Sequence, residues 1–131
     1  MILLDTPVLV WAAVEPDRLS PRARAAIRDG SRGEGLALAA ISTWELAMLF
    51  ARGRLRAAGT IERVIASMIT RTGVSVREVT PAIAALAAEL PDQVPCDPAD
   101  RLICATAIAE GYPLVTRDTA LAAYSRLRTI W

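Results

Sequence analysis

Short apolar runs alternate with longer segments of helical pattern along the chain. The runs predict five strands, at Ile2–Leu4, Leu36–Ala40, Val74–Arg77, Pro113–Thr116 and Arg128–Ile130. Each run is brief and largely apolar, as expected for strands that helices cover on both faces. The strands are therefore expected to lie in the middle of the molecule.

Helix-start signals fill the stretches between these strands. Four of them place proline directly after Ser, Thr or Asp, a pair suited to an N-cap followed by the first helical residue. The predicted helices begin at Pro7, Pro21, Ser42, Thr60, Pro81, Pro98 and about Asp118. We expect the second helix to end near Arg28, the segment Gly30–Gly35 to form a short flexible loop, and Gly111 to stop the sixth helix.

Strands that alternate with helices predict βαβ units and a parallel sheet. The chain has 131 residues, a length typical of one domain, so residues 1–131 are expected to form a single unit. The predicted fold class is α/β, a three-layer α/β/α sandwich with a short parallel central sheet. In such sheets the functional edge lies at the carboxyl ends of the strands.

The absence of two residue types excludes several classes of catalytic site. The chain contains no histidine, which excludes His-dependent nucleophilic catalysis and every His-containing metal site. All fifteen basic residues are arginine, so a phosphate-loop lysine and a Schiff-base lysine are excluded as well. The net charge is only +1, so any electrostatic signal for a partner must be local.

Two further features bear on the compartment. Cys96 and Cys104 match no zinc spacing and are expected to be small buried hydrophobic residues in a reducing environment. The longest uninterrupted apolar stretches, such as Val8–Val14, have seven residues, whereas a membrane helix needs about 20. We therefore expect a cytoplasmic protein with no membrane partner.

Four acidic residues are the strongest candidates for chemistry. Asp5, Glu45 and Asp118 each follow the carboxyl end of a predicted strand, so they are expected on one edge of the sheet. Asp100 lies in the first turn of the helix that begins at Pro98, and the strand argument alone does not place it there.

Helix capping is an alternative explanation for each acid taken singly. Ser42-Thr43-Trp44-Glu45 fits a capping box, and Asp97-Pro98-Ala99-Asp100 fits an N-cap with an acid three residues later. Capping does not require the acids to gather on one edge, however, and a carboxylate has two oxygens, so capping and metal binding are compatible.

If the four carboxylates meet, their mutual repulsion calls for a cation. The chain supplies no lysine or histidine to neutralise them. An all-oxygen ligand set favours Mg²⁺ or Mn²⁺ over Zn²⁺. Such an ion keeps open positions for a phosphate oxygen and a water, which is the arrangement for metal-assisted phosphodiester hydrolysis with one or two metals.

Four segments carry a resemblance over essentially the whole chain: LLDTPVLVW, ISTWELAML followed by RGRL, DPADRLICATA and PLVTRD. In order and spacing they resemble the PIN domain, and specifically the VapC-type toxins of bacterial toxin–antitoxin systems. The resemblance implies a Mg²⁺-dependent endoribonuclease in which Mn²⁺ can substitute. It assigns the four catalytic and metal-binding acids to Asp5, Glu45, Asp100 and Asp118, and it implies that the fold brings Asp100 to the cleft.

The resemblance carries further expectations. Thr6 and Thr116 match positions that often carry a hydroxyl near the metal, and Asp97 matches a common acid, although a helix cap explains it as well. The family also implies a cognate VapB-type antitoxin and a homodimer. The chain departs from its relatives at Pro7, where many carry histidine.

Local positive charge suggests where RNA phosphates bind. Arg52, Arg54 and Arg56 follow the helix that carries Glu45, and Arg101 and Arg117 adjoin two of the acids. A solvated surface explains the first group equally well, and ion pairs explain the second. Few aromatic residues are expected at the surface, and Trp44 and Trp131 are interpreted as core or interface anchors instead of base-stacking platforms.

Two other functions are compatible with the fold. A phospho-receiver or small nucleotide-binding module needs a lysine or a glycine-rich phosphate loop, and the chain has neither. A non-catalytic interaction protein that keeps the PIN fold is the other alternative, and the presence of all four acids argues against it.

Overall fold

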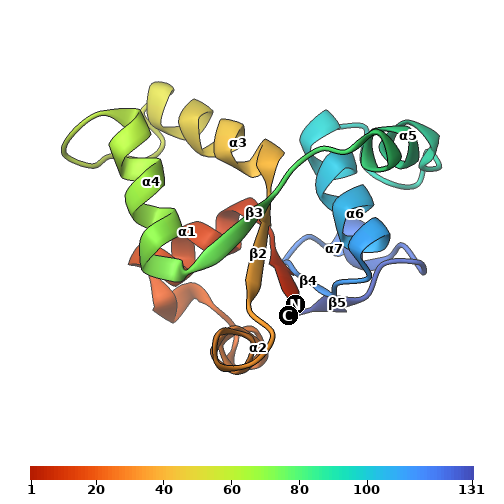
Figure 1. Cartoon of the computed structure of the whole chain (residues 1–131), viewed down its shortest axis with the longest axis horizontal. Helices are drawn as coiled ribbons and strands as arrows, with labels where there is room; N and C mark the ends of the chain where they lie inside the picture. The colour runs from red at the N-terminus through yellow and green to blue at the C-terminus, as the bar shows by residue number, and fades with distance from the viewer.

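Five short strands form one sheet in the computed structural model, which describes residues 1–131 (Figure 1). The strands are β1 (Ile2–Leu4), β2 (Leu36–Ala39), β3 (Val74–Arg77), β4 (Leu114–Val115) and β5 (Thr129–Ile130). Their order is β3-β2-β1-β4-β5, and every neighbouring pair is parallel. The predicted parallel sheet is therefore confirmed.

Helices cover both faces of this sheet (Figure 1). They are α1 (Thr6–Val14), α2 (Pro21–Arg32), α3 (Ala40–Ala51), α4 (Ile61–Thr72), α5 (Pro81–Glu89), α6 (Pro98–Glu110) and α7 (Thr119–Ala122), with a short 3₁₀ helix at Pro16–Arg18. The first four pack on one face and the last three on the other. This is the predicted three-layer α/β/α sandwich.

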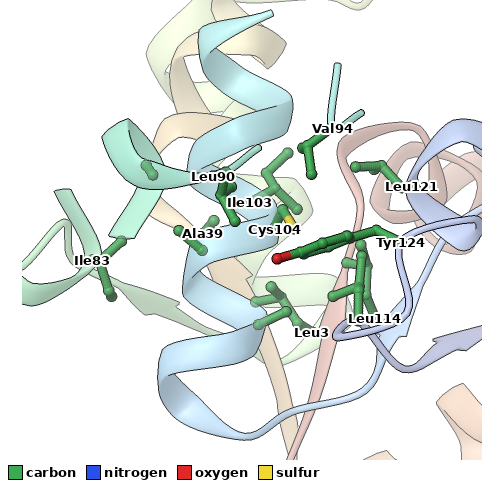
Figure 2. Packing of buried hydrophobic residues seen from close by; sticks show 14 of the residues in the cluster. Leu3, Ala39, Ile83, Leu90, Val94, Ile103, Cys104, Leu114, Leu121 and Tyr124 are labelled. Atoms are coloured by element: carbon green, nitrogen blue, oxygen red, sulfur yellow. The ribbon is translucent and has the colours of Figure 1, made fainter. Parts of the chain in front are cut away.

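The sheet separates two apolar cores because successive strand residues point to opposite faces. Leu3 and Leu114 belong to the core beneath α5, α6 and α7, whereas their neighbours Leu4 and Val115 belong to the core beneath α1 to α4. Figure 2 shows part of the first core, which also includes Tyr124. These four side chains are fully buried, so both faces of the central strands pack against helices.

Side-chain caps fix several of the helix ends that the sequence predicts. The hydroxyl oxygens of Ser20, Thr60 and Thr80 each accept a hydrogen bond from the backbone N–H three residues on, at 3.0–3.2 Å. Gly73 and Gly111 follow α4 and α6 with φ of 68° and 70°, a left-handed conformation that glycine adopts without strain.

Two local predictions are wrong. α2 continues to Arg32, so the predicted loop at Gly30–Gly35 is helical in its first part. Gly30 lies where a Cβ atom would come within 3.0 Å of side-chain atoms of Ile2 and Leu36, so this glycine serves close packing of the helix on the sheet. The capping box at Ser42 is also absent, because α3 begins at Ala40 directly after β2 and has no side-chain cap.

The cysteines differ from each other, which corrects the prediction that both are buried. Cys104 lies in the core beneath α6, and burial raises the pKa of its thiol to about 11. Cys96 is exposed. None of the helices is long and apolar enough to cross a bilayer.

Candidate functional site

A cavity of about 390 Å³ opens at the carboxyl ends of the central strands. All four predicted acids, Asp5, Glu45, Asp100 and Asp118, line it together. They come from four segments that are far apart in the sequence, so the fold, and no local motif, creates the cluster.

Helix starts position three of these acids. Asp5 follows β1 and is the N-cap of α1, and Asp118 follows β4 and is the N-cap of α7. Asp100 lies in the first turn of α6, behind the N-cap Asp97. Glu45 lies in the second turn of α3 and not in the first, because that helix begins earlier than predicted.

The position of Asp100 has a topological explanation. α6 ends at Gly111, just before β4 starts at the amino edge of the sheet. A helix of 13 residues is about 20 Å long. Its first turn therefore reaches the opposite edge, where the strands end. The short link between the helix and β4 was a sequence signal that could have placed Asp100 there without the family resemblance.

Two threonine hydroxyls hold the buried part of the cluster. Thr116 Oγ1 donates to Asp5 Oδ2 at 2.6 Å and accepts from the backbone N–H of Asp118 at 3.0 Å. Thr6 Oγ1 donates to Glu45 Oε1 at 2.6 Å, and the backbone N–H of Thr6 donates to Asp5 Oδ1 at 2.8 Å. The two hydroxyls thus connect Asp5, Asp118 and Glu45 across the strand ends.

Three carboxylates at this edge, those of Asp5, Glu45 and Asp100, have raised pKa values. Burial raises the pKa of Asp5, and hydrogen bonds from Thr116 and Thr6 oppose that shift. Burial also raises the pKa of Glu45, against the hydrogen bond from Thr6. The pKa of Asp100 is about 7, mainly because of burial and then because of the negative charges of Asp97 and the other acids.

No positive side chain forms an ion pair with the four acids. The three ion pairs of the structure all lie elsewhere and involve Glu34, Glu15 and Asp29. The four carboxylates share one cavity, yet no three acids, cysteines or histidines in the chain are close enough to form a ready-made metal-ligand group. Ligation of one ion by three of them therefore requires their side chains to turn toward one another.

Asp97 acts as the helix cap that the sequence suggested. Its Oδ1 accepts from the backbone N–H groups of Ala99 at 2.8 Å and Asp100 at 3.4 Å. Asp97 does not line the acidic cavity, although its charge raises the pKa of Asp100. It lines a second groove, which also includes Glu45.

The arginines predicted to bind phosphate occupy different surroundings. Arg117 lines the acidic cavity, and Arg52 and Arg54 line the neighbouring groove. Arg56 lies in neither, and faces a separate groove between α3 and α4. Arg101 donates through Nε to the carbonyl oxygen of Ala87 at 3.0 Å and through Nη2 to that of Leu90, so it anchors α6 to the end of α5.

The tryptophans differ from expectation in part. Trp44 is 57% exposed on α3, so it is not a core residue of this chain. Trp131 packs against Trp11, with 5.7 Å between ring centroids. Trp11 lines the acidic cavity, a position that was not predicted from the sequence. Trp11 lies four residues after Pro7 and three after Val8, so all three share one face of α1. This spacing was the sequence signal that could have placed Trp11 near the cavity.

Comparisons with known proteins agree with this architecture. Residues 2–127 match the family model for the PIN domain. The chain is 42% identical to Ribonuclease VapC22 of Mycobacterium tuberculosis, over 99% of this chain and 98% of that protein. The fold is similar to that of VapBC2 from Rickettsia felis bound to a promoter DNA fragment, with a TM-score of 0.74 and 18% identity over 98% of this chain and 97% of that one.

A second solved structure has the same fold. It is FitAcB from Neisseria gonorrhoeae, with a TM-score of 0.66 and 26% identity over 98% of this chain and 96% of that one. The family model and the 42% identical relative each span nearly the whole chain. The chain belongs to the PIN domain family.

Proposed function

We propose that this chain is a divalent-metal-dependent endoribonuclease and the toxin of a VapBC-type toxin–antitoxin pair. The observation that carries the proposal is the gathering of Asp5, Glu45, Asp100 and Asp118 around one cavity with no cation beside them in an ion pair. A 42% identical relative bears the name Ribonuclease VapC22, which supports RNA as the substrate.

The chemistry of the donor set fits Mg²⁺ or Mn²⁺. The four acids offer only oxygen ligands, which these hard cations prefer. Burial, and after it the charge of neighbouring acids, raises the pKa values of Asp5, Glu45 and Asp100, and a bound cation would favour their ionised forms. Asp5, Glu45, Asp100 and Asp118 would hold the ion. When bound, it would polarise a phosphate oxygen and lower the pKa of a water molecule.

The chain's own residues prepare the site for this reaction. Thr116 and the backbone N–H of Thr6 fix the two oxygens of Asp5, and Thr6 Oγ1 fixes one oxygen of Glu45. Hydrogen bonds of this kind orient ligands and leave their remaining lone pairs for the ion. Hydrolysis adds the oxygen of water to phosphorus and breaks the bond to the leaving oxygen, which takes up a proton.

Two partners belong to the proposal. VapBC2 of Rickettsia felis and FitAcB of Neisseria gonorrhoeae share this fold, and the VapBC2 structure includes promoter DNA. By this relation we propose a VapB-type antitoxin as the inhibitory partner of the chain, and a homodimer as its assembly. The exposed Trp44 on α3 supports a protein interface on that side.

Cleavage of a mixed RNA pool by the purified protein tests the activity. The reaction is run with Mg²⁺, with Mn²⁺ and with EDTA, and Asp100→Asn serves as the control for contaminating nucleases. We expect discrete products that need the metal and vanish in the variant. Equal cleavage by the parent and the variant would contradict the site. A parent that cleaves no RNA with either metal would favour the non-catalytic interaction protein.

A further inference from the structure

The acidic cavity has four further lining residues that metal binding does not explain. Besides the four acids it is lined by Pro7, Val8, Trp11 and Arg117, which we call its second wall. Three of these are apolar or aromatic and one is a cation, whereas metal ligands are anionic or neutral oxygen donors. This wall therefore has the composition of a surface for an organic anion.

Arg117 is the positive element of this wall and has no partner in the protein. Its side chain is exposed, and neither an ion pair nor a side-chain hydrogen bond involves it, although four carboxylates share its cavity. Its backbone is nevertheless fixed on both sides, because Thr116 bonds to Asp5 and Asp118 caps α7. The backbone of Arg117 is therefore anchored beside the cavity, and its guanidinium is free to bind a phosphate.

Trp11 is the aromatic residue of this wall, and its ring is packed against two neighbouring side chains. It is only 8% exposed, Trp131 packs against it with an interplanar angle of 58°, and the guanidinium of Arg18 lies 4.6 Å from the ring centroid. These neighbours occupy much of the ring surface, which leaves little room for a base to stack. What remains at the cavity is a rigid margin of the indole, suited to packing against a sugar or the edge of a base.

We propose that Arg117 and Trp11 form a nucleotide subsite beside the carboxylates, in which Arg117 binds a backbone phosphate and Trp11 packs against the attached nucleoside. The subsite rests on the proposed nuclease function, since it would hold the nucleotide next to the bond that is cut. The whole cavity, with the space beside the acids included, has a volume of about 390 Å³, and cavities for small organic ligands start at about 300 Å³.

Intrinsic fluorescence tests binding without relying on activity. The chain has three tryptophans, so a Trp44→Phe background leaves Trp11 and its neighbour Trp131 as reporters. Nucleoside 5′-monophosphates, and separately inorganic phosphate, are titrated in the presence of Mg²⁺. We expect a saturable change with a nucleotide and much weaker binding of phosphate alone. Equal affinity for both would overturn the role of Trp11.

Substitutions separate the subsite from a structural effect. Arg117→Gln should weaken nucleotide binding and raise KM for single-stranded RNA by about tenfold, as expected for the loss of one hydrogen-bonding charge. Arg117→Lys should recover part of the loss, and Trp11→Phe should weaken binding by a smaller factor. Arg32→Gln, at the far end of α2, is the matched control and should change nothing.

The readouts distinguish failure of the subsite from failure of the nuclease proposal. Mg²⁺ affinity measured by calorimetry should not fall in Arg117→Gln, because the variant removes a positive charge from the cavity, and a parallel loss would mean that Arg117 only supports the acids. If the parent cleaves RNA and Arg117→Gln keeps its KM, the subsite is wrong and the nuclease stands. If the parent binds nucleotide through Arg117 but cleaves no RNA, the nuclease is wrong and the subsite stands.

Discussion

Acidic side chains at the two edges of the sheet have pKa values shifted in opposite directions. At the amino edge, Glu34 accepts a 2.7 Å hydrogen bond from the N-terminal ammonium group of Met1, and this contact lowers the pKa of Glu34. Also at that edge, Arg128 Nη2 donates to the carbonyl oxygen of Gly111 at 2.7 Å. At the carboxyl edge, burial raises the pKa values of Asp5, Glu45 and Asp100.

This difference separates structural charges from charges kept for a ligand. At the amino edge, Glu34 has an opposite charge beside it within the chain, and this charge favours its ionised form. At the carboxyl edge four acids line one cavity and none of them has an ion-pair partner, and burial of their charges opposes folding. A cation that binds only the folded state would reverse this effect by mass action. The predictions below test the contrast, from the largest expected effect to the smallest.

Loss of one cavity acid should have the largest effect. Asp5→Asn is expected to lower metal-dependent RNA cleavage by about a hundredfold or more, because a charged ligand is removed from the metal site. Glu34→Gln, the matched change at the amino edge, should cleave RNA like the parent. Initial rates on one defined RNA product measure both, and circular dichroism confirms the folds. A slow Glu34→Gln enzyme would break the contrast between the edges.

The second-largest effect should be a pH dependence of the stability of the metal-free protein. Asp100 has a pKa of about 7 in the folded chain, above its ordinary value of 3.8. The folded state therefore holds this proton more tightly, so its stabilising effect is full below about pH 4 and lost as pH rises through 7. Thermal melting in EDTA should show the parent losing stability relative to Asp100→Asn across this range.

Addition of Mg²⁺ gives the second half of that experiment. At pH 8 the ion should raise the melting temperature of the parent more than that of Asp100→Asn, because the variant lacks one carboxylate ligand. The melting temperatures of the parent and Asp100→Asn could instead differ by the same amount at every pH, both in EDTA and with Mg²⁺. Ionisation of Asp100 would then not destabilise the folded chain.

The hydroxyl of Thr116 should have a smaller but measurable effect. Thr116→Val keeps the side-chain shape and removes the donor to Asp5 and the acceptor for the N–H of Asp118. We expect metal affinity to fall by about tenfold, as is typical when a group that orients a ligand is lost. Thr116→Ser restores the hydroxyl and should recover most of the affinity. Calorimetric titration with Mn²⁺ measures all three proteins.

Substitution of Arg101 should lower the stability of the fold more than the rate of RNA cleavage. Its effect on cleavage should be the smallest of those predicted. Its bonds to the carbonyl oxygens of Ala87 and Leu90 tie α6 to α5. Arg101→Gln is expected to lower the free energy of unfolding by about 1–3 kcal/mol, the range for leaving such partners unsatisfied. Chemical denaturation gives this value. An unchanged stability with a raised KM for RNA would instead restore Arg101 as a phosphate contact.

Local sequence signals predicted the elements well and the contacts between them poorly. The N-caps at Ser20 and Thr80 were predictable because the cap, its proline and the helix are neighbours in the chain. Ser42 misled because its motif fits a cap, whereas β2 runs into α3 without a break and buries the hydroxyl with no hydrogen-bond partner. A local pattern cannot reveal at which residue a strand ends and the next helix begins.

The amino-acid order alone sufficed for the α/β architecture, the parallel sheet and the placement of Asp5, Glu45 and Asp118 at strand ends. These features depend on periodicity and on groups close in the chain, which a linear pattern records. Folding alone decided that Thr116 bonds to Asp5 across 111 positions, that Arg101 anchors a helix and that Trp11 lines the acidic cavity. Such contacts arise from the packing of distant segments, where distance and burial have no counterpart in residue spacing.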